Sequence, residues 1–177
     1  MSKRLFLHRA VPARWVFALA LGLILHGVAG SAPVLAQGAG QAARPAGQPQ
    51  LPLEPLEIAT RNGVLAFEVE VARTSEALSM GLMHRTELPE RRGMLFDFKV
   101  DEPVAMWMKN TVLPLDMLFI RADGTIARIA AMTTPFSTAT IGSGEPVRAV
   151  LEIIGGSAKR LGIAPGDRVA HPILRGR

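Results

Sequence analysis

The chain contains no cysteine among its 177 residues. It can therefore form no disulfide, and its folded part must be stabilised by core burial alone. The absence of thiols also excludes thiolate catalysis, thiolate metal sites and the acylation of a lipoprotein cysteine.

Several signatures of catalysis are also missing. There is no glycine-rich phosphate loop, and the "GSG" at residues 142–144 lacks the rest of a nucleotide-binding fingerprint. There is no Gly-x-Ser-x-Gly elbow. Beyond residue 36 the only histidines are His84 and His171, which do not have metal-ligand spacing. We therefore expect no metal site and no cofactor, and the sequence assigns no catalytic residue.

Basic residues are few once the N-terminal segment is set aside. Four of the 20 Lys and Arg residues precede Gln37, which leaves 16 basic against 15 acidic residues, a net charge of +1. No clustered basic run occurs after that point. Because nucleic-acid binding requires a clustered basic surface, we expect no nucleic-acid partner.

Residues 1–36 have the pattern of a cleavable signal peptide. Basic residues precede an apolar run over 15–30, and small side chains at Val34 and Ala36 indicate cleavage near Ala36, before Gln37. The run is shorter than the roughly 20 apolar residues of a membrane span, so an uncleaved anchor is the weaker alternative. The opening "SKRLFLH" resembles a twin-arginine signal with lysine in place of one arginine, so the export route stays open. We expect an exported protein, periplasmic or secreted, without stable membrane insertion after cleavage.

The remainder divides into a linker and one domain. Residues 37–53 are rich in Gly, Ala, Gln and Pro and show no apolar periodicity, which predicts a disordered linker. Residues 54–177 have the length of a single ordinary domain. The sequence leaves the oligomeric state open.

Short apolar segments separated by turn signals fill this domain. Apolar and polar residues alternate over 65–71, which predicts a half-buried strand. Asp123 and Gly124 predict a hairpin, and Thr74 or Ser75 can cap a short helix. Further strands are expected at 94–98, 104–108, 115–120, 125–131, 147–154 and 168–173, with one helical turn at 157–162.

The pattern predicts a mainly β fold. We expect an antiparallel β-sandwich, jelly-roll-like, or a small barrel, with one or two short helices. A parallel α/β fold is disfavoured, because no long crossover helices separate the predicted strands.

Two carboxyl groups occur inside apolar strands. Asp116 lies in "PLDMLFI" and Glu152 in "AVLEIIGG", where burial is costly without a partner. If the strands at 104–109 and 115–120 pair, Lys109 comes near Asp116. We therefore predict a cleft for a small polar ligand or a saccharide, lined by Arg85, Trp107, Lys109, Asn110, Thr111, Asp116 and Glu152.

Structural roles are the alternative for these residues. Asp116 can accept backbone N–H bonds, and Glu152 can point outward on an edge strand. Trp107 is either a core residue or a binding platform. The polar segment 133–147 is either a flap over a site or a long connection.

The motifs together resemble the uncharacterised family named domain of unknown function 192. The resemblance covers about residues 56–171, and its most specific parts are "GLMHR" at 81–85 and "MWMKNT" at 106–111, with "VLEIIGG" and "LGIAPGDRV" later in the chain. It implies a jelly-roll β-sandwich with a small helical element, and no activity. The carried-over motif residues coincide with the polar set named above.

Three functions follow as hypotheses. The first is a non-enzymatic binding or accessory module of the cell envelope for a small polar ligand or saccharide. The second is a glycosidase-like hydrolase that uses Asp116 and Glu152 as a carboxylate pair. The third is Cu(I) binding by the thioethers of Met106 and Met108.

Overall fold

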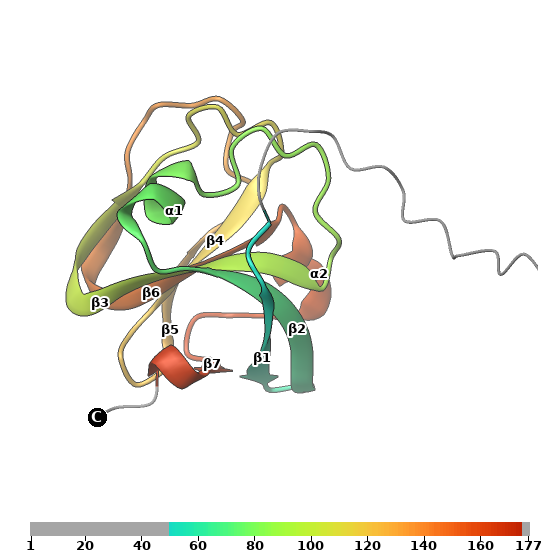
Figure 1. The fold of residues 1–177 in the computed structure, drawn as a ribbon. Coiled ribbons are helices and arrows are strands. Elements are labelled where there is room, and N and C mark those ends of the chain that lie inside the picture. The colour runs from blue at the N-terminus through green and yellow to red at the C-terminus, as the bar shows by residue number, and fades with distance from the viewer. Residues whose placement is uncertain (1–49, 175–177) are drawn as a thin grey trace, which may run out of the picture. The chain divides into compact units, whose positions relative to one another are not determined.

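The computed structural model describes residues 50–174, which contain one curled β-sheet and short helices (Figure 1). The predicted signal peptide and nearly all of the predicted linker lie outside the described residues, so both stay predictions. The strands are β1 (Leu53–Thr60), β2 (Gly63–Ala72), β3 (Arg92–Met106), β4 (Leu115–Ile120), β5 (Ile126–Ala130), β6 (Ile141–Ile154) and β7 (Arg168–Ala170). The helices are α1 (Ser75–Met80), α2 (Ser157–Leu161) and the 3-10 helix η1 (Pro172–Leu174). Within residues 50–174, none of the helices has the length and apolar character to span a membrane.

The strands form a single mixed sheet in the order β5-β4-β6-β3-β2-β1-β7. Every pair is antiparallel except β2 and β3, which are parallel. The mainly β class is therefore confirmed, whereas a purely antiparallel arrangement is wrong and the jelly roll is not confirmed. The reason lies in residues 73–91, which carry α1 and are long enough for the crossover that a parallel pair needs.

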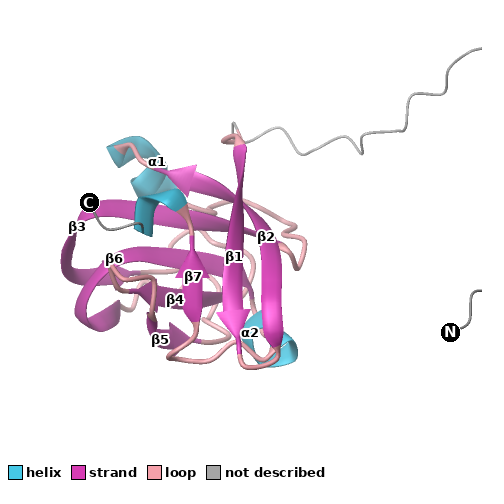
Figure 2. Ribbon diagram, turned by 90° about the horizontal axis from the view of Figure 1, so that it is seen from below, coloured by secondary structure: helices cyan, strands magenta, loops and turns pink. Residues whose placement is uncertain are grey.

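The sheet curls strongly on itself. Figure 2 shows β1, β2 and β7 running across the direction of β3, β4 and β6. An isolated bridge between Thr125 and Arg168 joins the β5 edge to the β7 edge at one point. The result is a half-barrel, which lies between the sandwich and the small barrel expected from the sequence.

Each face of the sheet carries its own apolar core. On one face, residues of β1, β2, β4 and β6 pack with α2 and η1, including Ile58, Val69 and Leu151. On the other, residues of β3, β4 and β6 pack with residues around α1, including Phe96, Phe119 and Val150. Because neighbouring residues of a strand point to opposite faces, β4 and β6 contribute to both cores.

The strand limits differ from the prediction where Pro and Gly occur inside strands. β3 joins two predicted segments, and β6 begins at Ile141, inside the segment 133–147 that was expected to be a loop. Register shifts between β3 and β6 near Pro103 show how the sheet accommodates the interruption. The connection between β5 and β6 is therefore shorter than expected.

The local turn and cap predictions are confirmed. The Thr74 hydroxyl accepts a hydrogen bond from the Ala77 N–H and so caps α1. Asp123 and Gly124 lie in the turn that joins the antiparallel pair β4 and β5.

Candidate functional site

Asp116 and Glu152 lie on adjacent strands but on opposite faces of the sheet. In the register of β4 and β6, Asp116 is opposite Ile153, and Met117 is opposite Glu152. Directly opposite residues share a face, and consecutive residues do not. The two carboxyl groups therefore cannot flank one glycosidic bond, and the hypothesis of a catalytic carboxylate pair is wrong.

Asp116 is fully buried and all of its hydrogen bonds are to backbone. Its Oδ1 accepts from the N–H groups of Met132 at 2.8 Å and Gly156 at 3.0 Å, and its Oδ2 accepts from Ala158 at 2.8 Å. Two of these donors belong to the N-terminus of α2, whose own cap residue, Gly156, has no side chain to offer. Asp116 thus caps a helix from a neighbouring strand, and its role is structural.

Lys109 does not meet Asp116. β6 lies between β3 and β4 in the sheet, so the strands before and after the segment 107–114 do not pair. The prediction of a hairpin over this segment is wrong. The Lys109 amine instead lies over the ring of Trp107, 5.4 Å from its centroid.

Glu152 is buried without the partners that Asp116 has. The residue is 4% exposed, its carboxyl oxygens are not completely enclosed, and no hydrogen bond or ion pair to them occurs among residues 50–174. Burial raises its pKa from 4.5 to about 8, because the ionised form loses its hydration. β6 has neighbours on both sides, so the alternative of an outward residue on an edge strand is also wrong.

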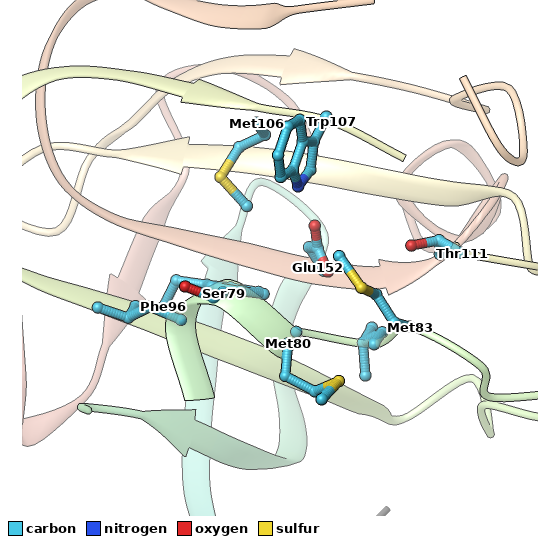
Figure 3. A pocket seen from close by; sticks show the side chains of 11 residues that line it. Ser79, Met80, Met83, Phe96, Met106, Trp107, Thr111 and Glu152 are labelled. Atoms are coloured by element: carbon cyan, nitrogen blue, oxygen red, sulfur yellow. The ribbon is translucent and has the colours of Figure 1, made fainter. Parts of the chain in front are cut away.

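The carboxyl group of Glu152 borders a small pocket between α1 and the end of β3. Figure 3 shows Glu152 at its floor, with Trp107 and Met106 on one side and Met83 and Met80 on the other. The cavity has about 30 Å³ open to the centres of water-sized molecules. It is lined by Leu78, Ser79, Met80, Gly81, Leu82, Met83, Phe96, Met106, Trp107, Thr111 and Glu152.

Polar groups are few in this pocket and come from separate elements. Trp107 follows β3 directly and is 50% exposed, so it lies at the surface rather than in the core. Figure 3 shows its indole nitrogen on the ring edge that faces Glu152. The buried Thr111 hydroxyl donates to the backbone carbonyl of Lys109 at 3.2 Å, which leaves its lone pairs available.

The loops around the pocket hold an unusual backbone. Three of the non-glycine residues with positive φ lie there: His84, Asn110 and Phe136. Such conformations are uncommon for bulky side chains and persist only where the surroundings impose them. Backbone hydrogen bonds connect these loops, from the His84 N–H to Asn110 and from the Phe136 N–H to Thr111. The pocket rim is therefore built from three loops that support one another.

Arg85 belongs to a different site. It donates to both carboxylate oxygens of Glu70, at 2.5 and 2.7 Å, and both side chains are nearly buried. The pair borders a second hollow, of about 300 Å³, together with residues 87–89. Glu70 was missed by the sequence analysis, since the alternation of β2 places it on the wet face. Arg85 covers it there.

The two methionines of the copper hypothesis have different surroundings. Met106 lines the pocket, whereas Met108 is fully buried and its sulfur accepts a hydrogen bond from the Thr133 hydroxyl at 3.1 Å. No group of three or more His, Asp or Glu side chains suited to a metal ion occurs in the described part of the chain.

The structure therefore divides the predicted site residues into three groups. Trp107, Thr111 and Glu152 line one pocket, and Lys109 and Asn110 lie at its rim. Asp116 and Arg85 lie elsewhere. The sequence analysis missed the residues of and after α1 that form the opposite wall, although "SMGLM" has a helical face interrupted by glycine.

Two solved structures resemble this chain over nearly their whole length. One is a candidate transcription regulator from Sinorhizobium meliloti 1021, with 46% identity and a TM-score of 0.67; the match covers 70% of this chain and 97% of that one. The other is a protein of unknown function from Novosphingobium aromaticivorans DSM 12444, with 39% identity and a TM-score of 0.68, covering 80% and 100%. No protein with a curated description matches the chain.

The family model DUF192, described as "Uncharacterized ACR", matches residues 57–171. That range contains every residue of the pocket and both of the most specific motifs, at 81–85 and 106–111. The chain therefore belongs to the DUF192 family, as its motifs predicted.

Proposed function

We propose that this protein is a non-enzymatic binding module, exported to the cell envelope, that binds a small polar ligand or a saccharide at the Glu152 pocket. The observation that carries the proposal is the carboxyl group of Glu152, buried and without a partner at the floor of a cavity. A buried polar group with no hydrogen bond destabilises the fold, so it needs a reason to be there. A bound ligand supplies one.

The surroundings of Glu152 support binding better than catalysis. The pocket lining holds no second titratable side chain, so an acid and a base are not paired there. Trp107, half-exposed beside the opening, offers an aromatic platform of the kind that binds sugars and other flat ligands. A site with one carboxyl group, one hydroxyl and one aromatic platform suits recognition.

Regulation of transcription, the role suggested for the Sinorhizobium protein, is less well supported for this chain. Residues 50–174 contain 13 basic and 15 acidic residues, a net charge of −2. A DNA-binding surface needs clustered positive charge to replace the counterions of the phosphates.

A thermal-shift screen of the full chain tests the proposal. The screen would include sugars, cell-wall fragments, small acids and small amines. A true ligand should raise the melting temperature of the wild type and have no effect on Glu152→Ala. Trp107→Ala provides a second variant at an exposed position, which keeps the test valid if Glu152→Ala does not fold.

Glu57→Ala is the matched control, because Glu57 is an exposed carboxylate on β1 and does not line the pocket. It should respond like the wild type. A ligand that shifts the wild type and both pocket variants equally would show that binding occurs elsewhere, and the proposal would be wrong.

A further inference from the structure

We infer that the group recognised at Glu152 is a carboxylate of the ligand, bound through oxygens that accept hydrogen bonds from Glu152 and Trp107. This inference rests on the proposed function and names the chemistry of the ligand. It depends on three features of the pocket: the direction of its donors, the charge at its rim and its size.

The first feature is the indole N–H of Trp107. It can only donate, it faces Glu152 across the pocket, and it makes no hydrogen bond to residues 50–174. An atom bound between these two groups must therefore accept a hydrogen bond. An ammonium group cannot do so, which argues against an amine even though a buried glutamate often suggests one.

The second donor is Glu152 itself. A carboxyl group that is 4% exposed and has no cation paired with it is held in its neutral form at pH 7, and its pKa of about 8 agrees. The residues opposite it on β3 and β4 are Met94 and Met117, which carry no charge. Neutral Glu152 has an O–H to donate, so two donors converge on one space.

The charge at the rim favours an anion over a neutral oxygen. The amine of Lys109 lies 5.4 Å from the centroid of the Trp107 ring. No acidic side chain except Glu152 lines the pocket in the described part of the chain. The field at the entrance is therefore positive and attracts an anionic ligand.

The size of the cavity fits the two oxygens of a carboxylate. One water molecule needs roughly 10–15 Å³ of such space, so about 30 Å³ holds two oxygen-sized atoms. A whole sugar ring is too large for this space. The rest of the ligand would lie outside, against the exposed side chains of Trp107 and Met80.

Isothermal titration of the full chain with butyrate, butanol and butylamine tests the inference, because these probes differ only in the polar group. Butyrate should bind best at pH 6. Its affinity should fall about tenfold per pH unit above the pKa of Glu152, because binding requires the acid form of Glu152. Glu152→Gln should keep binding butyrate, because the amide also donates, and should lose the pH dependence. A purely structural role for Glu152 would not produce that change.

Other results would overturn the inference in recognisable ways. Butylamine binding that strengthens with pH and disappears in Glu152→Gln would show a cation site. Butanol binding without pH dependence would show a hydroxyl site. Either result would leave the proposed binding function standing, whereas no binding by any probe or by any compound of the broader screen would contradict both.

Discussion

Asp116 and Glu152 are one residue out of register on adjacent strands, and the fold treats them in opposite ways. Asp116 is fully buried and accepts three backbone N–H bonds, from Met132, Gly156 and Ala158. Glu152 is 4% exposed and accepts none in residues 50–174. A buried carboxyl group therefore stabilises the fold at Asp116 and destabilises it at Glu152 at neutral pH.

The difference shows how a structural carboxylate can be separated from a functional one. Each N–H bond to a charged oxygen contributes about 1.5–3 kcal/mol, so Asp116 offsets its own desolvation within the fold. Glu152 accepts no hydrogen bond that would offset its desolvation, and its raised pKa reflects the free energy needed to ionise it in the fold. A perturbed carboxyl group in a cavity is the stronger candidate for a binding role.

The largest expected effect comes from replacing Asp116, the carboxylate whose oxygens accept backbone hydrogen bonds. Asp116→Asn should lower the free energy of unfolding by roughly 3–5 kcal/mol, because its amide N–H₂ would meet backbone donors where an acceptor oxygen now lies. Urea unfolding at pH 7 measures the change. Asp167→Asn is the matched control, since Asp167 accepts a single bond, from the Ala164 N–H, at an exposed turn. Equal losses in the two variants would contradict the capping role of Asp116.

The next largest effect is the dependence of stability on pH that the buried Glu152 produces. The unfolded chain releases the Glu152 proton near pH 4.5, whereas the folded chain holds it to about pH 8. Between these values the folded state binds more protons, so this group lowers the free energy of unfolding by about 1.4 kcal/mol per pH unit as pH rises. Its contribution is therefore complete below pH 4.5 and is lost progressively up to pH 8.

Glu152→Gln removes this titration and provides the comparison. The variant and the wild type should be about equally stable at pH 4.5, and the variant should be more stable by about 3 kcal/mol at pH 7. Paired urea unfolding curves at half-unit intervals of pH give the difference directly. A difference that does not change with pH would mean that Glu152 ionises normally in the fold.

The two carboxyl groups also show where reading the sequence succeeds. Their apolar surroundings marked both as unusual positions for a carboxyl group, although an outward Glu152 stayed an alternative. The cap at Thr74 and the turn at Asp123 depend on neighbours within a few residues. Such local signals survive without any knowledge of the fold. The motif at 106–111 likewise located four predicted residues that are at the pocket: Trp107, Lys109, Asn110 and Thr111.

What the sequence could not supply is the pairing of distant strands. Placing β6 between β3 and β4 is a contact between residues far apart in the chain, and it separates Lys109 from Asp116. A shift of one residue in that register would place Asp116 directly opposite Glu152, on the same face of the sheet. The residues on either side of Asp116 and Glu152 are compatible with both registers. The predicted cleft of seven residues therefore wrongly included Asp116 and Arg85.

The smallest expected effect on stability sharpens the comparison at the pocket itself. Trp107→Phe keeps a six-membered aromatic ring and removes the indole N–H together with the five-membered ring that carries it. Because Trp107 is half-exposed, the free energy of unfolding should change by no more than about 0.5 kcal/mol. Butyrate affinity should nevertheless fall about fivefold to tenfold, the effect of one lost hydrogen bond. Val64→Ala, at an exposed apolar residue on β2 that does not line the pocket, is the control and should bind like the wild type. Unchanged affinity in Trp107→Phe would show that the N–H does not contact the ligand, and Glu152 would then act without its second donor.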